Sequence, residues 1–126
     1  MNYFQMMIKV IIAGGRDFNN YIYLKSRCDF FLERFIDNQE EIIIVSGGAK
    51  GADRLGEQYA RERGFEIKHF PADWNGLGKG AGHIRNGEMA NYSDCLISFW
   101  DGKSLGTEGM ISKARKKELL IRIVKY

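Results

Sequence analysis

Apolar residues fall into two alternating patterns along this chain. Short runs rich in β-branched residues are typical of buried strands, and longer stretches with apolar residues at helical spacing predict helices. The predicted strands cover residues 8–13, 42–45, 65–70, 95–100 and 119–124. The predicted helices cover residues 21–36, 52–63, 83–92 and 107–117, and a loop with four glycines is expected over 72–82.

Local signals mark several ends of these elements. Asn20 stands just before the first helix, where a side-chain oxygen can accept a hydrogen bond from a first-turn N–H group. Gly64 follows the second helix and suits the left-handed conformation that ends many helices. Pro71, the only proline of the sequence, closes the third strand. The boundaries therefore agree with the apolar pattern.

The alternation of strands and helices predicts an α/β fold. We expect a single Rossmann-like domain over residues 1–126, with three layers around a mainly parallel five-stranded sheet. The expected strand order is 3-2-1-4-5. In open sheets of this kind, ligands bind beyond the carboxyl ends of the strands, where the strand order reverses. The loops at those ends are therefore the first place to look for chemistry.

Composition narrows the class of protein. A chain of 126 residues with 44% hydrophobic residues can bury a core, and a net charge of +3 is too small to indicate nucleic acid by itself. A membrane-spanning helix needs about 18 consecutive apolar residues, and no apolar run in the sequence approaches this length, so we expect no membrane partner. Residues 1–7 lack a signal-peptide pattern. Cys28 and Cys95 form no metal-binding or redox spacing with each other or with the two histidines, His69 and His83. We expect a cytoplasmic protein without a metal site.

The segment 46–53 joins the strand 42–45 to the helix 52–63 by a glycine-rich turn. Glycines let the backbone turn sharply and let a ligand approach it closely. The first-turn N–H groups of the following helix carry positive partial charge, which suits a phosphate. A tight turn without a ligand is the structural alternative. The candidate ligand-binding residues of this segment are Ser46, Gly47, Gly48, Lys50, Gly51 and Asp53.

Two further loops at the same predicted edge have a similar character. One follows the first strand, and the other precedes the last helix and offers hydroxyl groups. Arginine can hold a phosphate through two hydrogen bonds, and Arg16 should reach this edge. Asp17 or Asp53 could orient an arginine or accept a hydrogen bond from a ribose, while Asp53 could equally favour the helix dipole. The additional candidate residues are Gly14, Gly15, Arg16, Asp17, Ser104, Gly106 and Thr107.

A second candidate cation and two tryptophans lie near the predicted cleft. Arg85 and Asn86 belong to the helix that follows the glycine loop, although a solvated surface arginine is an equal alternative for Arg85. Trp74 and Trp100 flank the cleft, where an aromatic ring can stack on a base. Packing in the core is the commoner role for tryptophan.

These motifs together resemble the YspA-like branch of the SLOG superfamily. The resemblance implies a Rossmann-like fold that binds a nucleotide or a nucleotide derivative similar to ADP-ribose or NAD, with no required cofactor. It also implies a homodimer, and a sensing or sequestering role in bacterial or phage stress and defence. The motifs that carry it are Gly14-Gly15-Arg16-Asp17-Phe18, Ser46 to Asp53, Phe70-Pro71-Ala72-Asp73-Trp74, Arg85-Asn86 with Met89, and Phe99-Trp100-Asp101-Gly102 through Gly106-Thr107.

An enzyme is the first alternative. The LONELY GUY phosphoribohydrolases of the same superfamily carry P-G-G-x-G-T-x-x-E with a catalytic glutamate and an upstream arginine. Here Arg85 resembles that arginine, but Met110 takes the position of the glutamate. A methionine can neither move a proton nor stabilise a cationic sugar. If the chain cleaves an N-glycosidic bond, Glu88 or Glu108 would have to replace the glutamate, beside Arg85.

A single-stranded DNA-binding module is the second alternative. The segment 46–53 also resembles S-G-x-A-x-G-x-D of the DNA-processing protein A family, in which that loop meets DNA phosphates. A basic run over residues 113–117 could form a nucleic-acid patch, but cations also suit the C-terminal end of a helix. Binding to DNA should weaken steeply with salt.

Overall fold

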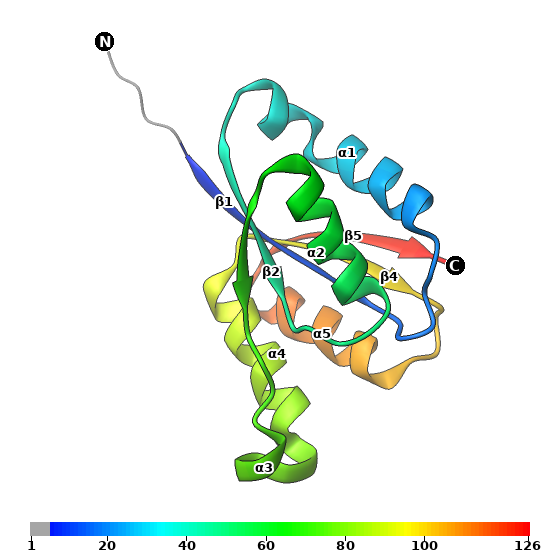
Figure 1. Ribbon diagram of the computed structural model, residues 1–126. Coiled ribbons are helices and arrows are strands. Elements are labelled where there is room, and N and C mark those ends of the chain that lie inside the picture. The colour runs from blue at the N-terminus through cyan, green and yellow to red at the C-terminus, as the bar shows by residue number, and fades with distance from the viewer. Residues whose placement is uncertain (1–5) are drawn as a thin grey trace.

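A computed structural model describes residues 6–126 and contains five strands and five α-helices (Figure 1). The strands are β1 (Met7–Gly14), β2 (Glu41–Ser46), β3 (Glu66–His69), β4 (Cys95–Trp100) and β5 (Leu120–Lys125). The helices are α1 (Tyr21–Asp37), α2 (Ala52–Arg63), α3 (Trp74–Leu77), α4 (Ala81–Tyr92) and α5 (Leu105–Lys116), with a 3-10 helix η1 (Gly78–Gly80) between α3 and α4.

The five strands form one sheet in the order β3-β2-β1-β4-β5, and every neighbouring pair is parallel. The predicted fold class and strand order are confirmed. In the centre of the sheet, Ile11 of β1 pairs with Val45 of β2 on one side and with Leu96 of β4 on the other. The chain builds the sheet outward from β1 to β3 and then returns to the other side of β1, so the strand order reverses between β1 and β4.

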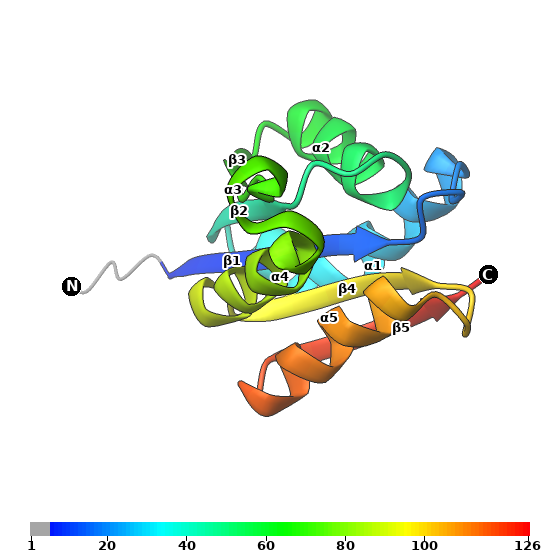
Figure 2. The ribbon, with the colours of Figure 1, turned by 90° about the horizontal axis from the view of Figure 1, so that it is seen from below.

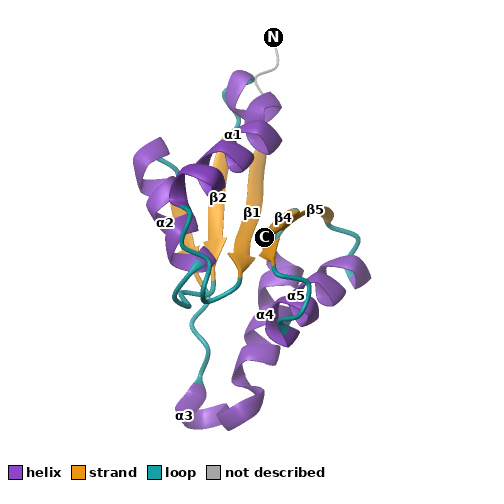
Figure 3. Ribbon diagram, turned by 90° about the vertical axis from the view of Figure 1, so that its right-hand side faces the viewer, coloured by secondary structure: helices purple, strands orange, loops and turns teal. Residues whose placement is uncertain are grey.

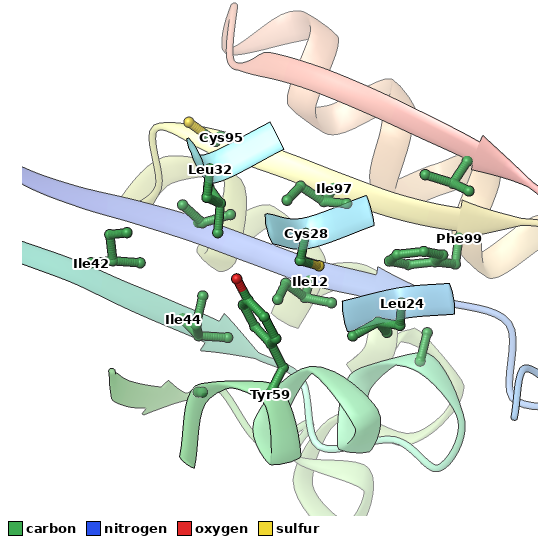
Figure 4. Packing of buried hydrophobic residues seen from close by; sticks show 14 of the residues in the cluster. Ile12, Leu24, Cys28, Leu32, Ile42, Ile44, Tyr59, Cys95, Ile97 and Phe99 are labelled. Carbon is green, nitrogen blue, oxygen red and sulfur yellow. The ribbon is translucent and has the colours of Figure 1, made fainter. Parts of the chain in front are cut away.

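Helices cover both faces of the sheet (Figure 2). Alternate residues of β1 point to opposite faces, as strand geometry requires. Ile12 packs with Leu24 of α1 and Tyr59 of α2 on one face (Figure 4), whereas Ile11 packs with Met89 of α4 and Met110 of α5 on the other. Burial on both faces explains why the central strands β1, β2 and β4 are almost continuously apolar, whereas the edge strands β3 and β5 carry exposed polar residues.

The helix ends follow the predicted signals, with one clear exception. The Asn20 side chain accepts a hydrogen bond from the Tyr23 N–H at 3.0 Å, and Gly64 ends α2 in the left-handed conformation with φ +76°. The expected loop over 72–82 is instead mostly helical. The Asp73 side chain caps α3 by accepting from the Gly76 N–H at 2.9 Å. Its glycines hid this helical segment, because glycine has no side chain to show periodicity.

Among residues 6–126, no helix is both long and apolar enough to cross a membrane. Residues 1–5, which carry most of the segment examined for a signal peptide, lie outside the described part of the chain. The carboxyl ends of β1 and β2 point toward α3 and the beginning of α4 (Figure 3).

Candidate functional site

A cavity of about 630 Å³ opens beyond the carboxyl ends of β1 and β4, where the strand order reverses. Its walls come from the β1–α1 loop, the β2–α2 loop with the start of α2, the beginnings of α3 and α5, and one face of α4. The cavity therefore lies where the fold class predicts a ligand site.

Ten of the residues predicted from the sequence to bind a ligand line this cavity. They come from four segments that are far apart along the chain. Arg16 and Thr107, for example, both line this one cavity. The structure thus brings these residues together around one cavity, while their contact with a ligand stays a prediction. These ten residues are Gly14, Gly15, Arg16, Asp17, Asp53, Arg85, Asn86, Ser104, Gly106 and Thr107.

The remaining predicted residues lie outside the cavity lining. Ser46 is buried, and its hydroxyl donates to Glu57 Oε2 at 2.6 Å and accepts from the Gly48 N–H at 3.1 Å, so it shapes the loop. Lys50 lines a smaller neighbouring hollow. The residues outside the cavity lining are Ser46, Gly47, Gly48, Lys50, Gly51, Glu88 and Glu108, and the two glutamates are exposed on α4 and α5.

Gly51 serves the packing of one loop on another. Its φ of +88° is a conformation that favours glycine, and a Cβ there would stand 2.3 Å from the Gly15 carbonyl oxygen. The neighbouring Ala52 N–H donates to that same oxygen at 3.1 Å. The β1–α1 loop and the start of α2 are thereby held together at the cavity edge.

Arg85 joins α4 to the β2–α2 loop. Its Nη1 donates to the Gly47 carbonyl oxygen at 2.7 Å, and its Nε donates to Asn86 Oδ1 at 2.9 Å. A Cβ on Gly47 would stand only 2.4 Å from Nη1, so a side chain at this position would have to displace the guanidinium. The contact holds the half-buried guanidinium at the cavity wall.

Asp53 is a buried carboxyl in the same wall, 5% exposed. Its Oδ2 accepts from the Ala49 N–H at 3.3 Å. Burial raises the pKa of Asp53 to about 6, while the N–H groups of Ala49 and Gly14 and the nearby Arg85 guanidinium act in the lowering direction. The cavity therefore contains a carboxyl that titrates close to neutral pH.

The loop before α5 is rigidly hydrogen-bonded. Asp101 Oδ1 accepts from the N–H groups of Lys103 and Ser104, each at 2.8 Å, and these bonds lower the pKa of Asp101. Ser104 occupies the N-cap position, yet within the described residues its side chain makes no capping bond. The Ser104 side chain thus leaves the first-turn N–H groups of α5 uncapped at the edge of the cavity.

The two tryptophans have different roles. The Trp74 side chain is 52% exposed, lines the cavity and lies against Gly82, where a Cβ would stand 3.3 Å from the ring. Trp100 packs against the core beneath α4 and α5, and its Nε1 donates to the Ser104 carbonyl oxygen at 3.1 Å. Trp74 is therefore the ring available to a ligand.

Sequence reasoning missed part of the α4 and α5 walls, including His83 and Leu105. A usable signal existed: Gly82, Arg85, Asn86 and Met89 follow i, i+3, i+4, i+7 spacing and so share one helix face. Met110 forms an apolar part of the opposite wall and is 2% exposed.

Comparison with known proteins identifies the family. The sequence profile of the YspA, cpYpsA-related SLOG family matches residues 8–76, just over half of the chain. The protein belongs to this family. This SLOG-family protein is also 37% identical over 116 residues to the Gene 61 protein of Mycobacterium phage D29, an alignment that covers 87% of this chain and 90% of the phage protein.

Solved structures with low sequence identity share the SLOG fold. DNA processing protein A from Streptococcus pneumoniae matches with a TM-score of 0.70 and 18% identity over 93% of this chain. The corresponding protein from Helicobacter pylori matches with a TM-score of 0.65 and 23% identity over 92% of this chain. The SLOG chain spans 50% and 64% of those two proteins. The protein TM1055 matches with a TM-score of 0.64 and 19% identity, over 92% of this chain and 72% of its own. The chain is thus a SLOG domain with a nucleotide-related binding fold.

Proposed function

We propose that the cavity binds a nucleotide derivative similar to ADP-ribose or NAD, and that the protein senses or sequesters this ligand. One observation carries the proposal: Arg16, Arg85 and the first turn of α5 meet around one cavity at the carboxyl edge of the sheet. Arginine forks and helix N-termini both favour phosphate oxygens, and here they face the same space.

The size and character of the cavity support this ligand class. Its volume of about 630 Å³ falls among those of small-molecule sites, which span roughly 300–1,000 Å³. Carboxylates of Asp17 and Asp101 could accept hydrogen bonds from ribose hydroxyls, and the half-exposed Trp74 ring offers a surface for a base. The cavity lining thus offers carboxylates for a sugar, an aromatic ring for a base and arginines for phosphate groups.

Binding is favoured over hydrolysis by the wall around Met110. Met110 lines the cavity at the position that the catalytic glutamate takes in the phosphoribohydrolase motif, and neither Glu88 nor Glu108 lines the cavity. Incubation with NAD and AMP followed by chromatography tests the enzyme alternative. We expect both substrates to remain unchanged. Release of free base would show that the protein cleaves the N-glycosidic bond and would refute a role in binding alone.

Titration calorimetry with ADP-ribose, NAD and AMP tests the proposed function. Arg16→Ala should weaken binding about tenfold or more, because a charge-assisted hydrogen bond contributes roughly 1.5–3 kcal/mol. Arg115→Ala is the matched control: it removes the same charge from the last turn of α5, at the opposite end of that helix from the cavity. Absence of binding to all three ligands, or equal binding by Arg16→Ala and wild type, would refute the proposal.

Single-stranded DNA is a second candidate ligand. The fold is shared with Helicobacter pylori DNA processing protein A, whose structure gives insight into its single-stranded DNA binding mode. Arg16, Lys50 and Arg54 also line one hollow beside the cavity. A mobility-shift assay at low and high salt tests this candidate, since phosphate contacts weaken steeply as salt rises. Unshifted DNA at low salt excludes it.

A further inference from the structure

A second hollow of about 260 Å³ adjoins the main cavity. We call it the cationic annex. It shares four of its lining residues with the cavity, so a ligand in one can reach into the other. The shared residues are Arg16, Ala49, Trp74 and Arg85, and the annex is completed by Lys50, Arg54 and Ala72.

Every charged side chain that lines the annex is a cation. These are Arg16, Lys50, Arg54 and Arg85, and within residues 6–126 none of them pairs with a carboxylate at 4.0 Å or less. The buried Asp53 lies near Arg85 and offsets part of that one charge. The annex therefore has a surplus of positive charge that nearby carboxylates offset only in part.

The cations reach the annex from three separate parts of the fold. Arg16 comes from the β1–α1 loop, Lys50 and Arg54 from the β2–α2 loop and the start of α2, and Arg85 from α4. Arg54 is directed along the loop by a 3.4 Å bond from its Nε to the Gly48 carbonyl oxygen. Solvated surface cations usually spread apart, because like charges repel. Four of them around one hollow with an aromatic wall indicate a site for an anion.

We propose that the cationic annex binds an additional phosphate group of the nucleotide, so that the protein prefers nucleotides phosphorylated on a ribose 2′ or 3′ hydroxyl. This inference rests on the proposed function: the pyrophosphate or 5′-phosphate occupies the main cavity, and the extra phosphate enters the annex between Lys50 and Arg54. Both side chains are exposed, and the bond from Arg54 Nε to the Gly48 carbonyl leaves the terminal nitrogens of that guanidinium for a dianionic phosphate.

Pairs of ligands that differ by one phosphate test the annex directly. Suitable pairs are NAD and NADP, ADP-ribose and its 2′-phosphate, and AMP and adenosine 3′,5′-bisphosphate. The measured quantity is the ratio of dissociation constants within each pair, which cancels general losses of affinity. In the wild type, at least one pair should show a gain of about tenfold or more from the extra phosphate.

Two sets of variants locate the effect. The double variant Lys50→Gln with Arg54→Gln should bring the ratio close to one, and Arg54→Lys should keep much of the gain because it keeps the charge. The control double variant Arg115→Gln with Lys116→Gln removes the same charge from the far end of α5 and should keep the wild-type ratio.

The outcomes separate the annex from the proposed function. If NAD or ADP-ribose binds but no pair gains from the added phosphate, the annex proposal is wrong and the proposed function stands. A gain that persists in the Lys50/Arg54 double variant also overturns the annex. If neither member of any pair binds, both proposals fail. Tighter binding of a single-stranded oligonucleotide than of every nucleotide tested would assign the annex to a nucleic-acid backbone and overturn the preference proposed here.

Discussion

Replacing Asp53 by asparagine should remove a pH dependence of stability that this carboxyl imposes on the fold. Asp53 is 5% exposed, and its burial raises its pKa from 3.8 to about 6. The substitution keeps the shape of the side chain and its acceptor oxygen for the Ala49 N–H, but it removes the charge. The change therefore isolates the cost of ionising this group inside the protein.

The sign follows from proton linkage. Because the folded-state pKa of Asp53 lies above the unfolded value, the folded protein binds more protons between about pH 4 and pH 6, and its stability falls as the pH rises through that window. A rise of about two pKa units corresponds to about 3 kcal/mol. The free energy of unfolding of the wild type, relative to Asp53→Asn, should therefore fall by about 3 kcal/mol between pH 4 and pH 7.

Urea unfolding of wild type and Asp53→Asn across this pH range measures the difference. Asp101→Asn is a control of opposite sign, because hydrogen bonds from Ser104 and Lys103 lower the pKa of Asp101. The stability that ionised Asp101 contributes is present above about pH 4 and is lost only as the pH falls further. The stability profile of Asp101→Asn should therefore parallel that of the wild type between pH 5 and pH 7. Parallel profiles for wild type and Asp53→Asn from pH 4 to pH 7 would refute the reasoning.

Two further predictions concern the cavity. Gly47→Ala should displace Arg85, because a Cβ would stand 2.4 Å from its Nη1. Calorimetry should then show weaker nucleotide binding, while circular dichroism shows an unchanged fold. Wild-type affinity would mean that Arg85 does not position the ligand. Binding of NAD near pH 6 should be accompanied by uptake of a proton, since an anion near Asp53 favours the neutral form of this carboxyl. Calorimetry in two buffers of different ionisation enthalpy measures the uptake. If the uptake persists in Asp53→Asn, the proton does not bind to Asp53.

The sheet was predictable because its signal is repeated and strong. The central strands β1, β2 and β4 are apolar runs that are largely buried, and right-handed crossovers limit the possible strand orders. The helix 52–63 was predicted with the observed bounds because its glycines mark both ends, with Gly51 before it and Gly64 after it. The segment 72–82 failed for the opposite reason. Its glycines interrupt any periodicity, and α3 depends on the single capping side chain of Asp73.

The location of the site could be inferred from the fold class, but the contacts of single residues could not. Arg16 and Thr107 reach one cavity because both follow strands whose carboxyl ends share an edge. No pattern in the sequence shows that Arg85 donates to Gly47, since these residues are 38 positions apart and meet only through the packing of α4. The raised pKa of Asp53 is likewise a consequence of burial, which a sequence pattern does not measure.

The glycine-rich segment 46–53 also has packing roles that its motif does not show. Phosphate binding by its glycines stays a prediction, while Gly47 leaves room for the guanidinium of Arg85 and Gly51 leaves room for the Gly15 carbonyl. Gly47 and Gly51 thus admit other parts of the protein, and those parts line the cavity. It follows that a larger residue at Gly47 or Gly51 should impair binding through displaced neighbours. Substitution of Arg16 or Arg85 should impair binding by the loss of the contact itself.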